Sequence, residues 1–182
     1  LDNWMYNSKS SRKLAWREGK LDESPSDPRG QWGMATDAYG RLYHNSNSVW
    51  FQVDWGMYDR AWPANKKTVG SPTREVFAIR PNTALNRNYK PGSLREDGRV
   101  ARVTTISGLA VHSHGAFGEE WEGAIFSMSP GTNTVGAFIP IKPFPHSEDY
   151  LHQTYADPIW GKREFLASTD ERFRPVNGTI GP

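Results

Sequence analysis

Short apolar runs separated by glycine, proline and asparagine are the feature of this sequence that most restricts its fold. Runs of this length indicate many short β-strands joined by turns, and helical signals are weak throughout. The 17 Gly and 13 Pro among 182 residues supply the turns without making the sequence low in complexity. The predicted strands are Met34–Ala38, Arg41–Asn45, Val49–Val53, Glu75–Ile79, Arg99–Val103, Gly108–His112, Gly123–Met128 and Thr134–Ile141.

Two turns between these strands can be read directly from the residues. In Asp37–Arg41, the aspartate opens a tight turn and Gly40 supplies the positive φ that such a turn needs. Pro130–Asn133 separates the last two predicted strands. Both turns are typical of short strands that follow one another along the chain.

The segments outside these strands carry weaker signals. Trp4–Trp16, Phe117–Trp121 and Asp149–Tyr155 could each hold a short helical turn, although Ser and Asn interrupt the first. Asp22–Gly30 and Arg80–Gly98 are rich in turn-forming residues and lack periodicity, so we predict that both are long surface loops. Loops of this length are uncommon in compact domains unless they are functional, and a propeller or barrel tolerates them on one face.

Charge and composition exclude several classes of function. The net charge is +2, from 22 basic and 20 acidic residues, which gives no reason to expect a nucleic-acid or anionic-membrane partner. The absence of cysteine excludes disulfides, thiolate metal sites and a cysteine nucleophile. No apolar stretch approaches the roughly 20 residues of a membrane-spanning helix. No phosphate-binding loop, dinucleotide fingerprint or nucleophile elbow is present.

Three segments, taken in order, carry a resemblance to a known family. They are Gly30–Ser48, then Ala101–Thr104 through Trp121–Phe126, and finally Arg163–Asn177 followed by Gly181–Pro182. The run Phe165–Asn177 is the most specific because it is long and unusual in composition. Together the segments resemble the β-propeller domain of membrane-bound dehydrogenases of planctomycete-type bacteria. Those domains are similar in turn to sorbosone and soluble glucose dehydrogenases that use pyrroloquinoline quinone (PQQ).

The resemblance implies an all-β fold, a β-propeller built from four-stranded antiparallel sheets with long loops on one face. A blade takes roughly 40–50 residues, so residues 1–182 are expected to form about three to four blades of a single propeller domain that is truncated at both ends. The rest of the ring would come from the same polypeptide or from a partner chain. Lys142–Ile159 is predicted to be an inserted loop. The chain also departs from the family near Ser107, where members often have Cys, and at His114–Ala116, where an Arg-Gly-Asp-like turn is replaced.

The resemblance also implies an activity. It predicts a PQQ-dependent oxidoreductase that oxidises a sugar or another alcohol, with Ca²⁺ assisting, a cytochrome c as electron acceptor, and a periplasmic or secreted location. The alternative is a non-catalytic propeller that acts as a carbohydrate-binding or assembly subunit of a larger complex. The altered residues near Ser107 and His114 favour that alternative.

The candidate catalytic residue is His44, which lies where a predicted strand runs into a loop. A histidine there could accept a proton from a substrate hydroxyl during hydride transfer, because imidazole titrates near neutral pH. Asn45 and Asn47 are the candidate substrate-binding residues, since their amides could orient polar groups. The alternative interpretation is a loop cap, for which asparagine is favoured by turn geometry.

A second cluster offers contacts for the cofactor. PQQ carries three carboxylates, and an arginine guanidinium can bind a carboxylate through two parallel hydrogen bonds. Arg172, Arg174 and Asn177 are therefore the candidate cofactor-binding residues, beside Asp170. Alternation along an extended chain, favoured before Pro175, would place both arginines on one face. The alternative is a structural salt-bridge network between neighbouring blades.

Weaker candidates complete the set. His112 and His114 are spaced to share one face of a strand and could bind a metal, but a turn pair is the simpler interpretation. A glycosidase would need two carboxylates across a cleft. His146 and His152 could join the two histidines at a metal. The candidate glycosidase carboxylates are Glu119, Glu120 and Glu122. A platform for stacking a sugar could be formed by Trp50, Trp55, Tyr58 and Trp62 with Asp54 and Asp59.

Overall fold

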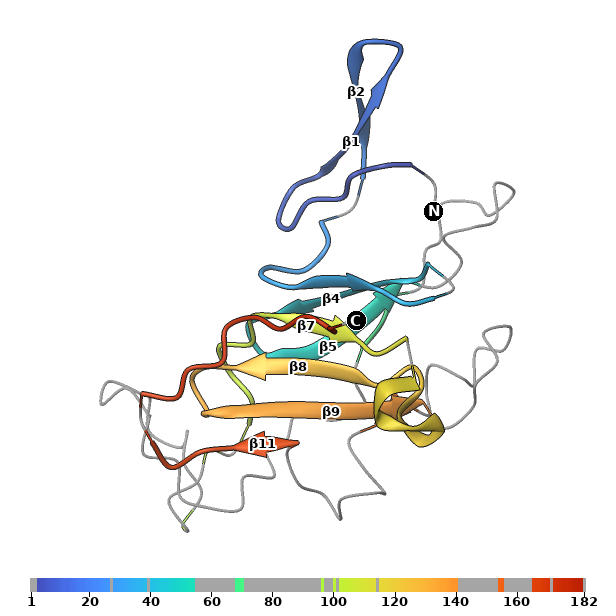
Figure 1. The fold of residues 1–182 in the computed structure, drawn as a ribbon. Coiled ribbons are helices and arrows are strands. Elements are labelled where there is room, and N and C mark those ends of the chain that lie inside the picture. The colour runs from blue at the N-terminus through green and yellow to red at the C-terminus, as the bar shows by residue number, and fades with distance from the viewer. Residues whose placement is uncertain are drawn as a thin grey trace.

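The computed structural model describes residues 3–26, 28–38, 40–54, 68–70, 96, 100, 102–113, 115–140, 154–155, 165–170 and 172–181. These residues form short antiparallel strands and two single-turn 3-10 helices, η1 (Gly115–Phe117) and η2 (Glu119–Trp121) (Figure 1). The all-β expectation is confirmed, as is the helical turn predicted within Phe117–Trp121. Within the described part of the chain, no helix is long and apolar enough to cross a membrane.

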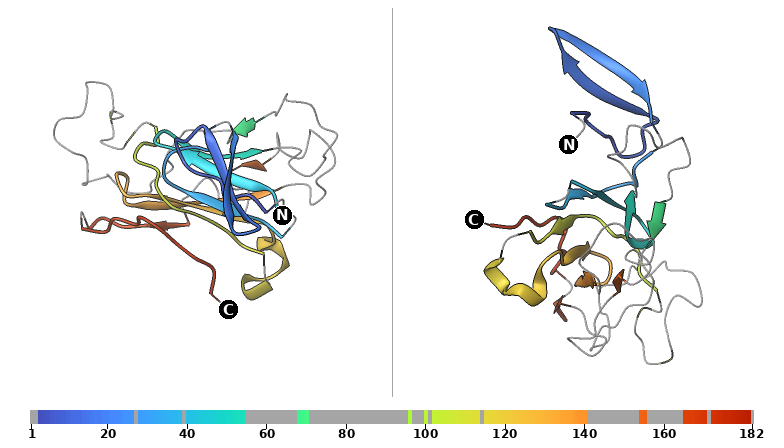
Figure 2. Two further views of the ribbon diagram at one scale, coloured as in Figure 1. Left: turned by 90° about the horizontal axis from the view of Figure 1, so that it is seen from above. Right: turned by 90° about the vertical axis from the view of Figure 1, so that its right-hand side faces the viewer.

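An N-terminal hairpin stands away from the two larger sheets (Figures 1 and 2). Its strands β1 (Arg12–Arg17) and β2 (Lys20–Pro25) pair in antiparallel register from Arg12–Pro25 to Arg17–Lys20. Glu18 and Gly19, with φ of 49° and 75°, form the two-residue turn. Positive φ at both central residues matches the right-handed twist of paired strands.

The hairpin overturns two of our predictions. The helical turn predicted within Trp4–Trp16 is wrong, because Arg12–Arg17 forms β1 and Met5 bridges to Leu14. The loop predicted over Asp22–Gly30 is wrong over its first residues, which belong to β2. The tight turn brings these polar residues beside β1, and backbone pairing there outweighs their weak β-propensity.

The first of the two larger sheets is a meander of four antiparallel strands in sequence order. Its strands are β3 (Met34–Thr36), β4 (Leu42–Ser46), β5 (Val49–Asp54) and β6 (Thr68–Gly70). The predicted turn at Asp37 is confirmed: Asp37 O accepts from Gly40 N at 2.9 Å, and Gly40 has φ of 74°. Asp37 also forms a buried ion pair with Arg41, which fixes the turn against β4.

The second sheet repeats this pattern. Its strands β7 (Leu109–Val111), β8 (Ile125–Ser129) and β9 (Thr134–Pro140) are neighbours in that order. Two short strands, β10 (Thr154–Tyr155) and β11 (Leu166–Ala167), both pair with β9. This second sheet therefore joins β7 to β10 and β11, which are far from β7 in the sequence.

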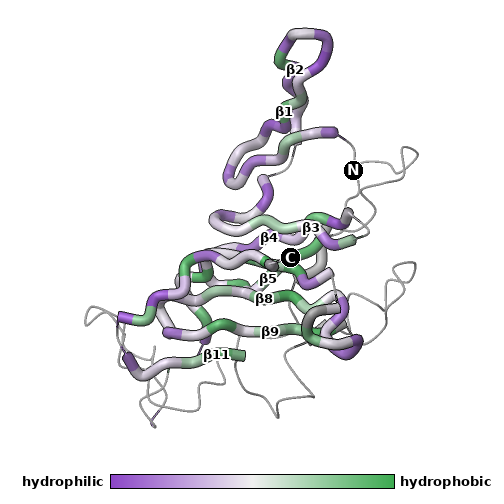
Figure 3. The backbone as a smooth tube through the Cα atoms, in the orientation of Figure 1, coloured by the Kyte–Doolittle hydropathy of each residue, from purple (hydrophilic) through white to green (hydrophobic). Residues whose placement is uncertain are grey.

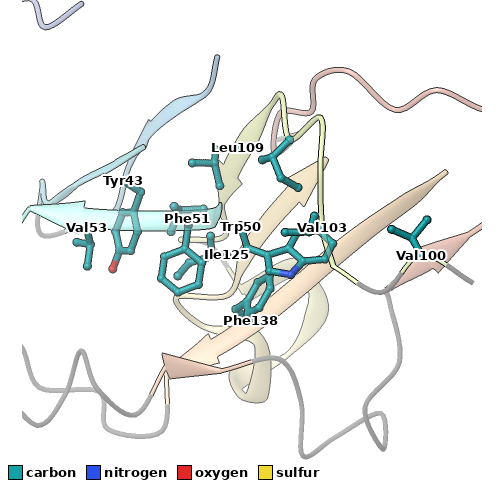
Figure 4. Close-up of a cluster of buried hydrophobic side chains, with 11 residues drawn as sticks. Tyr43, Trp50, Phe51, Val53, Val100, Val103, Leu109, Ile125 and Phe138 are labelled. Atoms are coloured by element: carbon teal, nitrogen blue, oxygen red, sulfur yellow. The ribbon is translucent and has the colours of Figure 1, made fainter. Parts of the chain in front are cut away.

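The main hydrophobic core lies between the two sheets (Figure 4). The ring of Phe138 lies 5.5 Å from that of Trp50 and 5.2 Å from that of Phe51, between ring centroids. Ser127 faces the same core, and its hydroxyl donates to the Trp50 carbonyl at 2.7 Å. The apolar residues concentrate in β5, β8 and β9, whereas the tip of the N-terminal hairpin is hydrophilic (Figure 3).

A smaller core covers the opposite face of the second sheet. Phe126 and Met128 alternate along β8 with the residues that face the main core, as the two-residue period of a strand requires. Trp121, from η2, and Ile180, near the C-terminal end, pack over this face. Both faces of β8 are buried as a result.

The two sheets, one of four strands and one of five, agree with the coarse expectation of small antiparallel sheets. Within the described residues, the sheets do not close into a ring. Of the predicted strand Arg99–Val103, the structure describes Val100 and Arg102, each in a single β-bridge, and Val103; Arg99 and Ala101 lie outside the described residues. The predicted strand Glu75–Ile79, and all of the predicted insertion Lys142–Ile159 except β10, lie outside the described residues.

Close packing between the sheets gives a testable prediction. A Cβ added at Gly136 would lie 2.9 to 3.1 Å from ring atoms of Trp50. Gly136→Ala should therefore lower the free energy of unfolding by about 1–3 kcal/mol, the usual effect of overpacking, in urea denaturation. Gly115→Ala is the control, because a Cβ there would meet no atom within 4 Å. Equal effects of the two substitutions would contradict the packing described here.

Candidate functional site

Asn45 occupies the centre of a polar junction at Ser107 and Gly108. Its side chain is fully buried. The Oδ1 atom accepts from the Gly33 backbone N–H at 2.9 Å, and Nδ2 donates to the Ser107 carbonyl at 2.7 Å and the Gly108 carbonyl at 3.5 Å. One amide therefore connects the end of β4 to the loop before β7.

Two glycines allow the backbone to approach this amide closely. A Cβ at Gly33 would lie 2.4 Å from the Ser107 carbonyl oxygen, and a Cβ at Gly30 would lie 2.0 Å from the Asn45 carbonyl oxygen. Gly30 also has φ of 66°. Only glycine fits such close contacts, so the segment around Trp32 is shaped to cover Asn45.

The C-terminal segment closes the other side of the junction. The Gly108 N–H donates to the Val176 carbonyl at 2.7 Å, and the Ser107 hydroxyl donates to the same carbonyl at 2.6 Å. A Cβ on Gly108 would lie 2.5 Å from the Cα of Asn177. In Figure 1 this segment runs across β7 toward the C-terminus.

The junction therefore brings together all three segments that carry the family resemblance. Gly30–Ser48 contributes Asn45, Ala101–Phe126 contributes Ser107, and Arg163–Asn177 contributes Val176. The hydrogen bond from Asn45 to Ser107 joins residues that are 62 positions apart in the sequence. This convergence is a property of the folded chain that none of the three segments reveals alone.

His44 lies in β4, where it pairs with Met34 on one side and Gln52 on the other. Its side chain is 3% exposed. The imidazole is thus beneath the surface, away from a substrate that binds at the protein exterior. No observation tests its predicted role as a base, which stays a prediction.

Asn47 lies in the two-residue turn between β4 and β5 and is exposed. Its backbone N–H donates to Oε1 of Gln31 at 2.8 Å, and its carbonyl accepts from the Ile106 N–H at 3.2 Å. Its side-chain amide makes no hydrogen bond within the described residues. Of the two asparagines predicted to bind substrate, Asn47 has its amide at the surface, whereas the amide of Asn45 is engaged inside.

Arg174 ties the C-terminal segment to the turn between β8 and β9. Its Nη1 donates to the Pro130 carbonyl at 2.9 Å and to Oδ1 of Asn133 at 3.4 Å. The same Asn133 donates through Nδ2 to the Asp170 carbonyl at 2.8 Å. Arg174 therefore makes structural contacts with backbone and amide groups, whereas the predicted salt-bridge network between blades stays a prediction.

Arg172 differs from Arg174 because it is exposed and its guanidinium makes no hydrogen bond or ion pair within the described residues. Its backbone N–H donates to Oδ1 of Asp170 at 2.9 Å, which fixes the main chain there. Both arginines are exposed and Phe173 between them is half-buried, an alternation that agrees with the prediction of one shared face for the arginines. The side chain of Arg172 is therefore open to solvent.

These residues allow a test of the implied cofactor and metal. Arg172 and Asn177 are exposed residues whose side chains carry N–H donors for carboxylates, which fits a polycarboxylate such as PQQ. Ca²⁺ prefers six to eight oxygen ligands, several of them carboxylates. Within the described ranges, no group of three or more His, Asp or Glu side chains is close enough to hold a metal ion. The described residues therefore do not fit calcium.

Sequence reasoning missed an aromatic cluster at the other end of β7. Phe126 and Phe165 have ring centroids 4.8 Å apart, and Trp121 stacks on Phe126 at 5.9 Å. Phe117 and Trp121 are four residues apart and could have been noticed together. Nothing in the sequence places Phe165 with them, because β11 reaches the sheet only through its pairing with β9.

The remaining candidates are distributed as follows. Trp50 is buried in the main core and is not a sugar-stacking surface. Glu119, Glu120 and Glu122 are exposed on or beside η2. The candidates that lie outside the described residues are Trp55, Tyr58, Asp59, Trp62, His114, His146 and His152, together with the side chain of Asp54.

Comparison with known proteins places this arrangement in a family. A family model described as a domain of unknown function, DUF7133, matches residues 1–182. The chain belongs to the DUF7133 family. No curated protein and no solved structure matches the sequence. The junction and the aromatic cluster are therefore features of a DUF7133 domain.

Substitution at the junction tests its structural role in this DUF7133 domain. Asn45→Ala should lower the free energy of unfolding by about 2–4 kcal/mol, because it leaves the Gly33 N–H and the Ser107 carbonyl without the amide that satisfies them. Asn47→Ala, in the exposed turn, should change it by less than about 0.5 kcal/mol. Chemical denaturation of both variants measures the difference. If the two variants proved equally stable, Asn45 would not hold the junction.

Proposed function

We propose that this chain forms part of a β-propeller domain of the quinoprotein dehydrogenase type, which oxidises a sugar or another alcohol. Two observations support the fold. Each larger sheet is an antiparallel meander of sequence neighbours, which is how propeller blades are built. The three segments that resemble those dehydrogenases also converge at Ser107 and Gly108.

The observation that carries the proposed activity is the exposed Arg172 on a main chain fixed by Asp170. In this proposal Arg172 binds a carboxylate of PQQ, and the exposed Asn177 amide donates to a second polar group of the cofactor. When bound, PQQ supplies the group that accepts hydride. Arg174 positions the segment by binding the Pro130 carbonyl.

The turn after β4 supplies the proposed contact with substrate. Asn47 is exposed there, and its backbone is fixed by Gln31 and Ile106. His44 lies nearby in the sequence but is 3% exposed, so direct proton abstraction would require a substrate hydroxyl to reach a buried ring. The geometry favours Asn47 over His44 as the residue that contacts substrate.

A second candidate function is a non-catalytic carbohydrate-binding or assembly subunit. The burial of His44 and Asn45 favours it, because two residues predicted for the active site face the interior. The Ser107 hydroxyl also donates to Val176, which gives this position a structural contact where members of the resembling family often carry cysteine. Function follows the site and not the fold, so cofactor binding decides between the two.

Titration with PQQ tests the first candidate directly. We expect PQQ to quench tryptophan fluorescence, and Arg172→Gln to weaken binding about tenfold or more, the effect of losing one charge-assisted contact of about 1.5 kcal/mol. Arg17→Gln, on the N-terminal hairpin, removes the same charge elsewhere and should leave affinity unchanged. Absence of PQQ binding in the full-length protein, with sugar binding retained, would instead support the non-catalytic candidate.

A further inference from the structure

His112 is a buried titratable side chain that the proposed function does not use. Its exposed fraction is 0%, and neither ring nitrogen has a hydrogen-bond partner within the described part of the chain. Its main chain is well held, since its N–H donates to the Ala124 carbonyl and its carbonyl accepts from Gly123. A neutral imidazole offers one donor and one acceptor, and leaving both unmet disfavours the folded state.

An exposed aromatic ring covers this imidazole. Phe117 stacks on His112 with ring centroids 5.1 Å apart and an angle of 28° between the planes. Phe117 is 49% exposed, and Phe165, whose ring centroid is 6.3 Å away, is 41% exposed. Trp121 contacts both phenylalanines. The imidazole therefore lies one ring below the surface, at the base of an aromatic cluster.

The segment that carries Phe117 is a short turn whose backbone forms few hydrogen bonds. It consists of two single 3-10 turns, and the bonds Gly118 N–H to Gly115 O and Trp121 N–H to Gly118 O measure 3.2 and 3.1 Å. Gly118 and Gly123 have φ of 98° and 77°. Phe117 therefore belongs to a turn and takes no part in the pairing of the strands beneath it.

The charge around the cluster restricts the ligand. Glu119, Glu120 and Glu122 are exposed on the same turn. Three carboxylates repel an anion but accept hydrogen bonds from hydroxyl groups. A hydroxyl can pair with either imidazole nitrogen, because it donates to the unprotonated nitrogen or accepts from the protonated one. Aromatic faces pack well against the C–H faces of a sugar ring, and ligand sites commonly combine such faces with few polar groups.

We propose that His112 is the hydrogen-bonding group at the base of a site for a neutral carbohydrate, and that Phe117 covers it when no sugar is bound. The sugar ring displaces Phe117, packs against the aromatic cluster of Trp121, Phe126 and Phe165, and places a hydroxyl against the imidazole. The nearby carboxylates accept its other hydroxyl hydrogens.

This site extends the proposed function and depends on it in one respect only, that the ligand is a sugar. It is separate from the C-terminal segment that carries Arg172. That segment contacts Gly108, just before β7, whereas His112 lies just after the last residue of β7. The four peptide steps between them span about 13 Å in an extended strand. Loss of PQQ binding and loss of sugar binding can therefore be measured independently.

The test uses His112→Leu, which keeps a similar volume and removes both unsatisfied nitrogens. Glucose and cellobiose, with glucuronate as the anionic comparison, are titrated by isothermal calorimetry. We expect the neutral sugars to bind, glucuronate to bind at least tenfold more weakly, and His112→Leu to lower the affinity for neutral sugars at least tenfold. The melting temperature of His112→Leu should stay the same or rise, because an unmet polar group is removed. Trp16→Phe, on the N-terminal hairpin, should change neither quantity.

A measurement on the unaltered protein guards against a variant that fails to fold. With ¹⁵N-labelled histidine, sugar should shift the ring-nitrogen resonances of His112 and leave those of His44 in place. No binding of either neutral sugar at 100-fold excess, an unchanged affinity in folded His112→Leu, or sugar binding with no shift at His112 would each overturn the proposal. PQQ binding by Arg172 would survive any of these results.

Discussion

The buried amide of Asn45 is the interaction on which the rest of the structure depends. It accepts from Gly33 and donates to Ser107, so it joins the first meander to the loop that starts the second. A buried amide is stable only when its polar groups are satisfied, and the close approach of Gly30 and Gly33 makes that possible. The C-terminal segment then adds to the same point through Val176.

This constraint also organises the functional surfaces. With the junction fixed, the extended C-terminal segment presents Arg172 and Asn177 to solvent at one end of β7. At the other end, His112 lies under Phe117. In our proposals the first surface binds carboxylates and the second binds a neutral ring with hydroxyl groups. A dehydrogenase acting on a sugar with a polycarboxylate cofactor needs both kinds of surface, whereas a non-catalytic binding subunit needs only the second.

Local signals in the sequence predicted most of the strands and the turn at Asp37, because periodicity and positive-φ residues act over a few positions. The hairpin strand β2 was missed because its polar residues pair only once Glu18 and Gly19 form a turn. The alternation of exposed Arg172 and Arg174 with half-buried Phe173 followed from the extended chain expected before Pro175. The burial of His44 did not, since alternation predicts one exposed face for a strand, whereas Leu42 to Asn45 of β4 are all buried. The aromatic cluster needed the pairing of β11 with β9, which no local pattern encodes.

Native-state amide hydrogen exchange tests the central claim, that one junction holds the two sheets and the C-terminal segment together. The account predicts that the amides of Gly33, Gly108 and Met128 exchange with the same free energy as those in β8 and β9, because all of them open only when the junction does. Exchange at Gly33 or Gly108 that is faster by orders of magnitude, with β8 and β9 still protected, would contradict it. The sheets would then be held by the apolar core alone, and Asn45 would be incidental to the fold.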